Sequence, residues 1–253
     1  MVSHLDPALP WKHLQRQRSK LFFMDFSRRS NTRELLDEEG IPFADIRKNM
    51  EELEQINTWL GGHAITISGF KHLLGGRKKI HICEIGCGGG DNLKAIAKWC
   101  RKHNIEVALT GIDIKDTCIE YAAINLKGYE TNLVISDYRT AVLADQPDII
   151  FSSLFCHHFS DERIVEILHW KHQHAKVGFF INDLHRNAIA YHSIKLITKV
   201  FSSSYLVQHD APISVTRGFS GDDWNRIITK AGLHANSLVK WKWAFRWLVS
   251  YTK

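Results

Sequence analysis

A glycine-rich turn is the first stretch of the sequence whose residue types could do chemistry. From Ile82 to Leu93 the chain reads ICEIGCGGGDNL, with four glycines among five residues between an apolar run and a helix-like pattern. Glycine reaches positive φ and lets backbone approach a ligand, but it loses more conformational entropy on folding than any other residue. We therefore predict that this turn contacts a ligand through its backbone.

The spacing of the turn separates the possible ligands. A dinucleotide fingerprint starting at Gly86 requires a sixth-position glycine, where this chain has Asp91. A P-loop is excluded because no Gly-Lys-Ser/Thr follows, and an acid at a helix start repels phosphate. Glu84 and the glycines instead fit the spacing E-x-G-x-G-x-G.

With this spacing, residues 75–253 resemble the class I S-adenosyl-L-methionine-dependent methyltransferases. The resemblance implies that Glu84 holds the amino end of the methionine moiety and that Asp113, in LTGIDI, accepts hydrogen bonds from the ribose hydroxyls. It also implies that Asp137 bonds the adenine amino group, with Tyr138 or Ile114 beside the ring, and that the segment after the fourth strand lies near the sulfonium. The predicted cofactor residues are Glu84, Gly86, Cys87, Gly88, Gly90, Asp113, Ile114, Asp137, Tyr138 and Ser153.

Methyl transfer requires positioning of two reactants and removal of a proton from the acceptor, usually by His, Asp or Glu. Candidates follow the fourth and fifth strands in SSLFCHHF and NDLHRN, and His158 is among them. Our hypothesis is that His157 or His185 deprotonates a hydroxyl while Asp183 orients the imidazole or the acceptor. No metal ion is expected, because Ser152, Ser153 and Leu154 offer no first carboxylate ligand for a hard cation.

A narrower resemblance concerns the acceptor. The motifs WLGG, SSLFCHHF, NDLHRN and HDAPISVTRGF, with an aromatic C-terminal hairpin, resemble methyltransferases associated with type III polyketide synthases. This resemblance implies secondary metabolism, with the methyl group going to oxygen on a small, aromatic and apolar substrate, a phenolic or polyketide-derived lipid. Two alternatives stay open: an RNA or protein methyltransferase, favoured by net charge and QRQRSK, and a non-catalytic S-adenosyl-L-methionine-binding partner protein.

The elements that position these residues alternate between short apolar runs and amphipathic helices from residue 76 onward. We predict an α/β fold with a doubly wound, seven-stranded sheet, Rossmann-like and mostly parallel, that ends in an antiparallel hairpin turning near Ala244. The predicted strands are 80–85, 107–113, 133–136, 148–152 and 177–182, and the predicted helices are 91–103, 116–126, 161–172, 186–201 and 222–231. After Phe201 a loop is expected that runs through Pro212 to Gly218.

Residues 1–75 carry helix signals only, and we predict that they form an N-terminal helical cap or lid on a domain of residues 76–253, which has a helical insert at about 186–217. One helix should begin after Asn31 in TRELLDEE and another should span 44–60.

Composition limits the remaining classes. The 253 residues are 44% hydrophobic and 24% charged with a net charge of +6, which is ordinary globular usage. No apolar run approaches the roughly 20 residues that a membrane span needs, so we expect a cytoplasmic protein. Nucleic acid is not the expected partner, because basic clusters of this size are usually solvated faces. The oligomeric state is left open.

Overall fold

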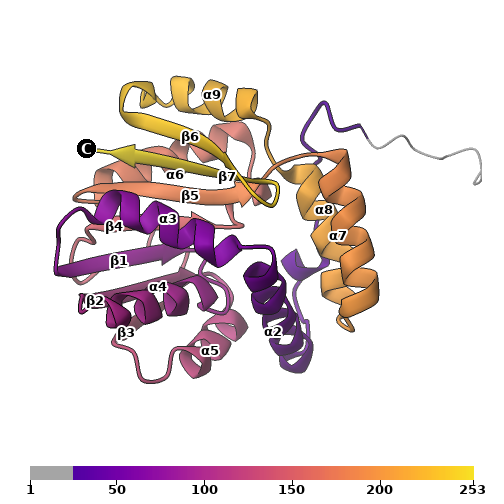
Figure 1. Ribbon diagram of the computed structural model, residues 1–253. Coiled ribbons are helices and arrows are strands. Elements are labelled where there is room, and N and C mark those ends of the chain that lie inside the picture. The colour runs from indigo at the N-terminus through magenta and orange to yellow at the C-terminus, as the bar shows by residue number, and fades with distance from the viewer. Residues whose placement is uncertain (1–24) are drawn as a thin grey trace, which may run out of the picture.

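The computed structural model of the chain describes residues 25–253 (Figure 1). The segment QRQRSK, which favoured a nucleic-acid partner, lies outside the described residues. A seven-stranded sheet forms the centre of the molecule, in the order β3-β2-β1-β4-β5-β7-β6. Its strands are β1 (Lys79–Ile85), β2 (Glu106–Asp113), β3 (Thr131–Ile135), β4 (Ile149–Ser153), β5 (Gly178–Leu184), β6 (Ser237–Lys242) and β7 (Arg246–Thr252).

Strand direction and register confirm the predicted fold class. The first five strands are parallel, and β7 pairs antiparallel with both β5 and β6. Within the register, Glu84 of β1 lies opposite Gly111 of β2 and Phe151 of β4. The first glycine-rich turn therefore leaves the sheet at its centre, where the strand order reverses and ligands bind in open α/β sheets.

Helices cover both faces of this sheet (Figure 1). Alternate residues of one strand point to opposite layers: Phe180 packs with α3 and α4, whereas Phe179 and Ile181 pack with α6 and α9. No helix in residues 25–253 is both long and apolar enough to cross a bilayer. The helices are α2 (Phe43–Trp59), α3 (Gly62–Leu74), α4 (Asp91–Lys102), α5 (Asp116–Asn125), α6 (Asp161–His174), α7 (Ala188–Phe201), α8 (Tyr205–Arg217) and α9 (Gly221–Lys230), with short 3-10 turns η1 (Leu35–Asp37), η2 (Cys156–His158) and η3 (His234–Asn236).

The segment before the sheet differs in part from the prediction. Helix α2 matches the expected helix over 44–60, but the helix expected after Asn31 is wrong, since only the turn η1 forms there. Its backbone is held by a distant side chain instead: the N–H groups of Leu35 and Leu36 donate to the two carboxylate oxygens of Asp210 at 2.8 and 2.9 Å. Helix α3, which belongs to the predicted N-terminal cap, packs on the sheet of the predicted domain. The boundary between cap and domain at residue 75 therefore stays a prediction.

The second difference is helix α8, which replaces the loop predicted after Phe201 and through Pro212 to Gly218. Ser204 caps this helix by accepting from the N–H of Val207, and Pro212 lies inside it. An internal proline costs about 3 kcal/mol in an isolated helix. Packing offsets that cost here, because Val207 and Val215 are buried against α7 in one apolar cluster.

Candidate cofactor and acceptor site

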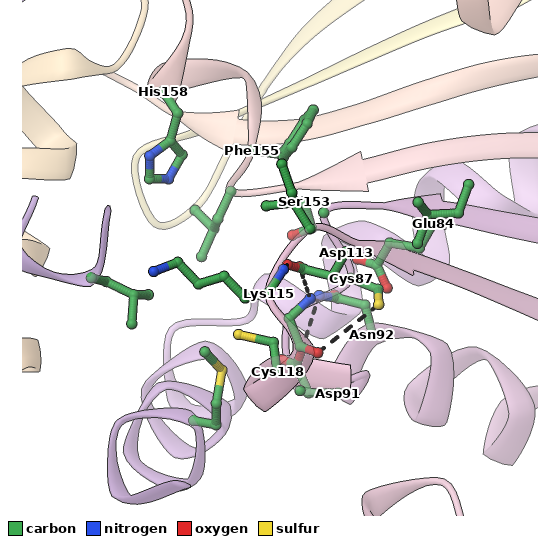
Figure 2. Close-up of a pocket in the computed structure, with 18 of the residues that line it drawn as sticks. Glu84, Cys87, Asp91, Asn92, Asp113, Lys115, Cys118, Ser153, Phe155 and His158 are labelled. Atoms are coloured by element: carbon green, nitrogen blue, oxygen red, sulfur yellow. Dashed lines mark hydrogen bonds between the residues drawn. The ribbon is translucent and has the colours of Figure 1, made fainter. Parts of the chain in front are cut away.

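A cavity of about 470 Å³, here called the central cavity, opens beyond the carboxyl ends of β1, β2 and β4 (Figure 2). The glycine-rich turn forms one wall, and the loops after β2, β3 and β4 form others. Helix α2 and the turn η1 complete it from outside the sheet. Because these segments lie far apart in the sequence, only the sheet topology brings them together.

The glycine-rich turn has the backbone that its sequence requires. Gly86, Gly88 and Gly90 have φ values of +65°, +49° and +73°, which residues other than glycine rarely adopt. Gly86 and Gly88 line the cavity, whereas Gly90 does not. A Cβ on Gly90 would lie 2.7 Å from Cδ1 of Leu126, so this glycine is explained by packing between α4 and α5.

Three buried polar side chains on the cavity wall have no hydrogen-bond partner for one atom each. They are Oε2 of Glu84, at the end of β1, the hydroxyl of Tyr138, after β3, and the hydroxyl of Ser153, at the end of β4. Burial, followed by the nearby charge of Asp91, raises the pKa of Glu84 well above its usual value. Buried polar atoms without partners are costly, and a bound donor such as an ammonium group would satisfy Glu84.

Asp113 is fixed by backbone at the end of β2. Its carboxylate accepts from the N–H of Gly88 at 2.9 Å and from the N–H of Lys115 at 3.0 Å. Burial nonetheless raises its pKa. A carboxylate has about four lone-pair sites, so Asp113 keeps capacity for two hydroxyl donors in the cavity. The neighbouring Ile114 is 68% exposed and also lines the cavity.

Asp137 and Tyr138, after β3, both line the cavity, but only one of them is free of strong partners. The Asp137 carboxylate binds the guanidinium of Arg139, whose Nε lies 2.9 and 3.0 Å from its two oxygens. Tyr138 is buried with an unpartnered hydroxyl, and its ring meets that of Phe155 edge-on at 6.2 Å. A ligand amino group at Asp137 would have to share the carboxylate with Arg139.

Comparison with known proteins agrees with this arrangement. Residues 82–178 match a family described as "Methyltransferase domain". No individual curated protein gives a significant sequence match. Residues 82–178 are therefore similar to a methyltransferase domain. The cofactor of methyltransferases with this fold is S-adenosyl-L-methionine, and the unpartnered Glu84 oxygen and the remaining acceptor capacity of Asp113 fit it.

Solved structures share the fold at low sequence identity. The plantazolicin methyltransferase BpumL, solved with SAH, aligns with a TM-score of 0.60 at 18% identity, covering 83% of this chain and 88% of BpumL. Magnesium protoporphyrin IX methyltransferase from Synechocystis PCC 6803, with bound SAM, gives 0.52 at 12% identity over the whole of both chains. A SAM-dependent methyltransferase from Aquifex aeolicus gives 0.56 at 15% identity, covering 84% and 99%.

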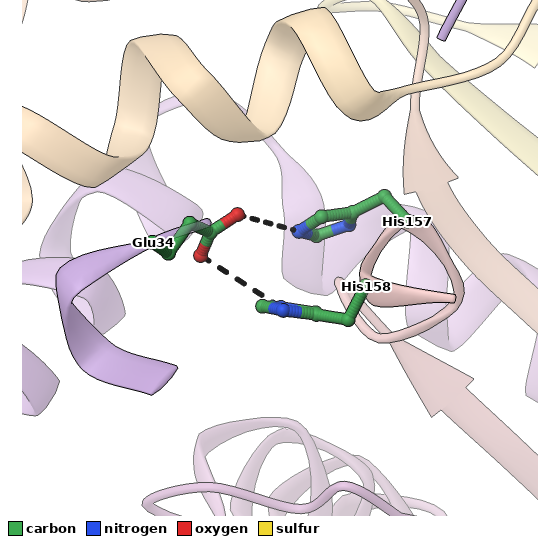
Figure 3. Close-up of side chains that lie close together, drawn as sticks. All are labelled: Glu34, His157 and His158. Carbon is green, nitrogen blue, oxygen red and sulfur yellow. Dashed lines mark ion pairs between the residues drawn. The ribbon is translucent and has the colours of Figure 1, made fainter. Parts of the chain in front are cut away.

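The two adjacent histidines of η2 have different surroundings in the methyltransferase domain (Figure 3). His157 is buried and lies outside the wall of the central cavity; its Nδ1 is 2.7 Å from Oδ1 of Asp183, and its Nε2 is 3.6 Å from Oε1 of Glu34. Burial alone would lower the pKa of His157, but Asp183 and Glu34 outweigh it and raise the pKa to about 9. His157 is therefore held as a cation between two carboxylates.

His158 is the histidine that lines the central cavity (Figure 2). Its Nδ1 lies 3.3 Å from Oδ1 of Asp37 and its Nε2 lies 3.8 Å from Oε2 of Glu34. The side chain is 24% exposed, in contrast to 2% for His157. Of the two histidines on this turn, His158 has access to a bound molecule.

The structure does not bring the other predicted catalytic residues to the central cavity. Asp183 is fully buried, and its two oxygens accept from His157, the N–H of Leu184 and the N–H of Cys156. His185 lies beside the C-terminal hairpin, where its Nδ1 accepts from Nε1 of Trp241 at 3.1 Å. Neither side chain is on the cavity wall. Proximity to the end of β5 was a poor guide here, because Asp183 is covered by η2 and His185 is bonded to the C-terminal hairpin.

Glu34, His157 and His158 also have the spacing of metal ligands, with donor atoms within 4.8 Å of one another (Figure 3). The Glu34 carboxylate already has two other partners: the Ser214 hydroxyl donates to it at 2.8 Å, and Nη1 of Arg217 lies 3.7 Å away. An entering cation would have to compete with this guanidinium. The cluster is better described as an ion-pair network in which Glu34 joins the N-terminal segment to η2.

Sequence reasoning missed the part of the cavity wall that precedes the sheet. Residues 34–38, here called the N-terminal strap, contribute Leu36 and Asp37, and α2 contributes Met50, Leu53 and Asn57. The strap is tied at its far end by Lys115, whose Nζ donates to the carbonyl of Glu38 at 2.9 Å. No sequence signal could identify these residues, because apolar positions on α2 have the same spacing whether they face a core or a ligand.

Proposed function

We propose that this methyltransferase domain transfers a methyl group to a hydroxyl of a small, aromatic and apolar acceptor, of the phenolic or polyketide-derived lipid class. The observation that carries the proposal is that one cavity is lined by Glu84 and Asp113, by an accessible histidine, and by an apolar wall. That wall consists of Leu36, Met50, Leu53, Tyr121, Phe155 and Phe159. A ligand surface without charge suits such a wall.

When bound, S-adenosyl-L-methionine supplies a methyl group on a positively charged sulfur. On this proposal, Glu84 accepts from the ammonium group, Asp113 accepts from the ribose hydroxyls, and Ser153 faces the sulfur-bearing part. Tyr138 and Ile114 lie against the adenine ring. The support for these roles is that each of the five side chains is on the cavity wall and that the Glu84 and Ser153 oxygens lack other partners.

We assign the proton acceptor to His158 in preference to His157 and His185. A base must come within hydrogen-bond reach of the proton that it removes, and only His158 of the three lines the cavity. Asp37 and Glu34 would orient its ring from the strap. The His157–Asp183 pair would act as a positioning device that fixes η2, since neither residue can touch the acceptor.

The charge of the wall argues against an RNA acceptor. Six carboxylic acids line the cavity, Asp37, Glu54, Glu84, Asp91, Asp113 and Asp137, against one lysine and two arginines, Lys115, Arg139 and Arg163. This excess of acids favours a cationic ligand and repels phosphate, whereas RNA-binding grooves are basic. Measured methyl transfer to each class of acceptor distinguishes our proposal from a protein acceptor and from a non-catalytic role.

The test is methyl transfer from labelled S-adenosyl-L-methionine to alkylresorcinols, simple phenols, peptides and RNA. We expect transfer to oxygen of the phenolic lipids. The variant His158→Gln should lose about 10²- to 10⁴-fold in single-turnover rate while cofactor affinity stays within threefold. The control is His103→Gln, which changes an exposed histidine on α4's C-terminal side. Labelling of RNA or peptide alone, or an unchanged rate in His158→Gln, would refute the assignment.

A further inference from the structure

Helix α7 has an apolar outer face that nothing in residues 25–253 covers. Its inner face packs in the core through Ala190, Ile194 and Thr198. Away from the core, Leu196 is 64% exposed and Val200 62%; Phe201, the last residue of the helix, is 68% exposed on the side of α7 that faces α2. Contiguous exposed apolar side chains of this size usually mark a binding surface.

The apolar face continues from α7 onto α2 and the C-terminal hairpin. The ring of Phe201 meets that of Trp59 edge-on at 6.1 Å, and Trp59 is 62% exposed at the end of α2. Trp243, at the hairpin tip, is 72% exposed, and its carbonyl oxygen lies beside Gly61, two residues after Trp59. We call this surface the α7–hairpin face; it consists of Leu196, Val200, Phe201, Trp59, Trp241 and Trp243.

Phe245 packs the C-terminal hairpin against both α2 and α7. Its side chain, one residue past the hairpin tip, packs in the same cluster as Ile56 of α2 and both Ala190 and Ile194 of α7. Figure 1 shows the hairpin between β6 and β7 pointing toward α7 and the upper end of α2. The face is thus built on packed secondary structure and not on a loose loop.

Four lysines are next to residues of the α7–hairpin face along α7 and β6. Lys195 and Lys199 lie on α7, and Lys240 and Lys242 lie on β6. Among residues 25–253 none of the four forms an ion pair with a carboxylate. At the end of α7 lies the acid Glu52, whose oxygens accept hydrogen bonds from the serines that follow the helix, Ser202, Ser203 and Ser204. The unpaired charge beside the apolar surface is therefore positive.

We propose that the α7–hairpin face docks the protein on an anionic lipid surface. Exposed tryptophans with flanking lysines are the composition that lies at the headgroup level of a bilayer, with apolar side chains inserted and lysines near anionic headgroups. A second copy of the chain fits less well, because a two-fold contact through this face would bring the same lysines together across the interface. The charge thus selects the lipid surface.

The α7–hairpin face and the central cavity share helix α2. Helix α2 carries Trp59 on this face and Met50, Leu53 and Asn57 on the wall of the central cavity. Docking would therefore bring the side of the cavity formed by α2 close to the bilayer. A cavity close to the bilayer is useful only for an acceptor that partitions into lipid, so this use of docking rests on the proposed function. The docking itself does not rest on it.

The experiment is co-sedimentation of the full chain with vesicles, without cofactor or acceptor. Vesicles of phosphatidylcholine alone are compared with vesicles containing 30% phosphatidylglycerol. We expect binding to the anionic vesicles that weakens with salt. Lys195→Gln combined with Lys199→Gln should weaken binding about 25-fold, at about fivefold per lysine. Leu196→Ser combined with Phe201→Ser should weaken it at least tenfold.

Matched controls are Val142→Ser and Ile124→Ser, which remove exposed apolar side chains away from this face, 84% and 62% exposed. Both should bind vesicles like the parent chain. Thermal unfolding and cofactor binding confirm that each variant folds. The proposal is overturned if anionic vesicles are not bound, or if the α7 variants bind as well as the controls. Self-association that Leu196→Ser with Phe201→Ser abolishes, without vesicle binding, would assign the face to a second copy and also overturn it. Because no acceptor is present, none of these outcomes depends on the proposed reaction.

Discussion

The buried His157 predicts a specific pH dependence of stability. In the folded chain the imidazole lies between Asp183 and Glu34, which together outweigh burial and raise its pKa to about 9, against 6.5 for an ordinary histidine. In the unfolded chain these partners are gone and the ordinary value returns. The folded state therefore binds the proton more tightly than the unfolded state does.

The sign and size follow from this difference in proton binding. Because the folded pKa is the higher one, the stabilisation is fully present below pH 6.5 and is lost as the pH rises through about 9. A gap between 6.5 and 9 corresponds to about 3 kcal/mol of unfolding free energy, at about 1.4 kcal/mol per pH unit. No discount for solvent screening applies, because the residue is 3% exposed.

Urea unfolding at pH 6 and pH 9 measures this effect directly. The parent chain should lose about 3 kcal/mol more between these pH values than His157→Gln does, because the variant has no group there to titrate. His103→Gln is the control and should follow the parent chain. Equal losses in the parent chain and His157→Gln would refute the claim that the buried pair is charged in the folded state.

Three further predictions use the same structure. Glu84→Gln should weaken S-adenosyl-L-methionine binding about 10- to 100-fold by calorimetry, because it removes the charge of a carboxylate with an unpartnered oxygen; a change under threefold would contradict the assignment. Gly90→Ala should cost about 1–3 kcal/mol of unfolding free energy, owing to a φ of +73° and contact with Leu126, yet leave cofactor affinity within twofold; a large affinity loss would show that Gly90 does face the cofactor. Lys171→Met should raise the free energy of unfolding by roughly 1–3 kcal/mol at pH 7, since burial lowers the Lys171 pKa to about 8 from 10.5. This gain should shrink as the pH rises from 8 to 10.5, which urea unfolding across that range measures. A constant gain would mean that the amine does not titrate there.

The sheet was predictable because its strands are buried on both faces. Runs such as those containing Ile82 and Phe180 are apolar at successive positions, and this pattern depends on no distant contact. Helix α8 and the turn η1 were not predictable for the opposite reason. Pro212 is a local signal against a helix that tertiary packing overrides, and η1 is held by Asp210, about 175 residues away in the chain.

The candidate site divides in the same way. Glu84, Gly86, Gly88 and Asp113 lie at strand ends, so their convergence follows from parallel topology alone. The choice between His157 and His158 does not, because adjacent residues on one turn point in different directions that depend on what covers them. His157 is enclosed between Asp183 and Glu34, whereas His158, which also lies near Glu34, keeps one side toward the central cavity.

The strap links the charge on His157 to the shape of the central cavity. Glu34 contacts His157, and Leu36 and Asp37, two and three residues later, form part of the cavity wall. When His157 loses its proton, the Glu34 carboxylate loses one attractive partner and keeps Arg217, Ser214 and His158 as neighbours. The segment that carries Leu36 is then held mainly by Asp210 and Lys115. Conditions that neutralise His157 should therefore loosen the cavity wall before they unfold the sheet, because the strap makes far fewer apolar contacts than the core does.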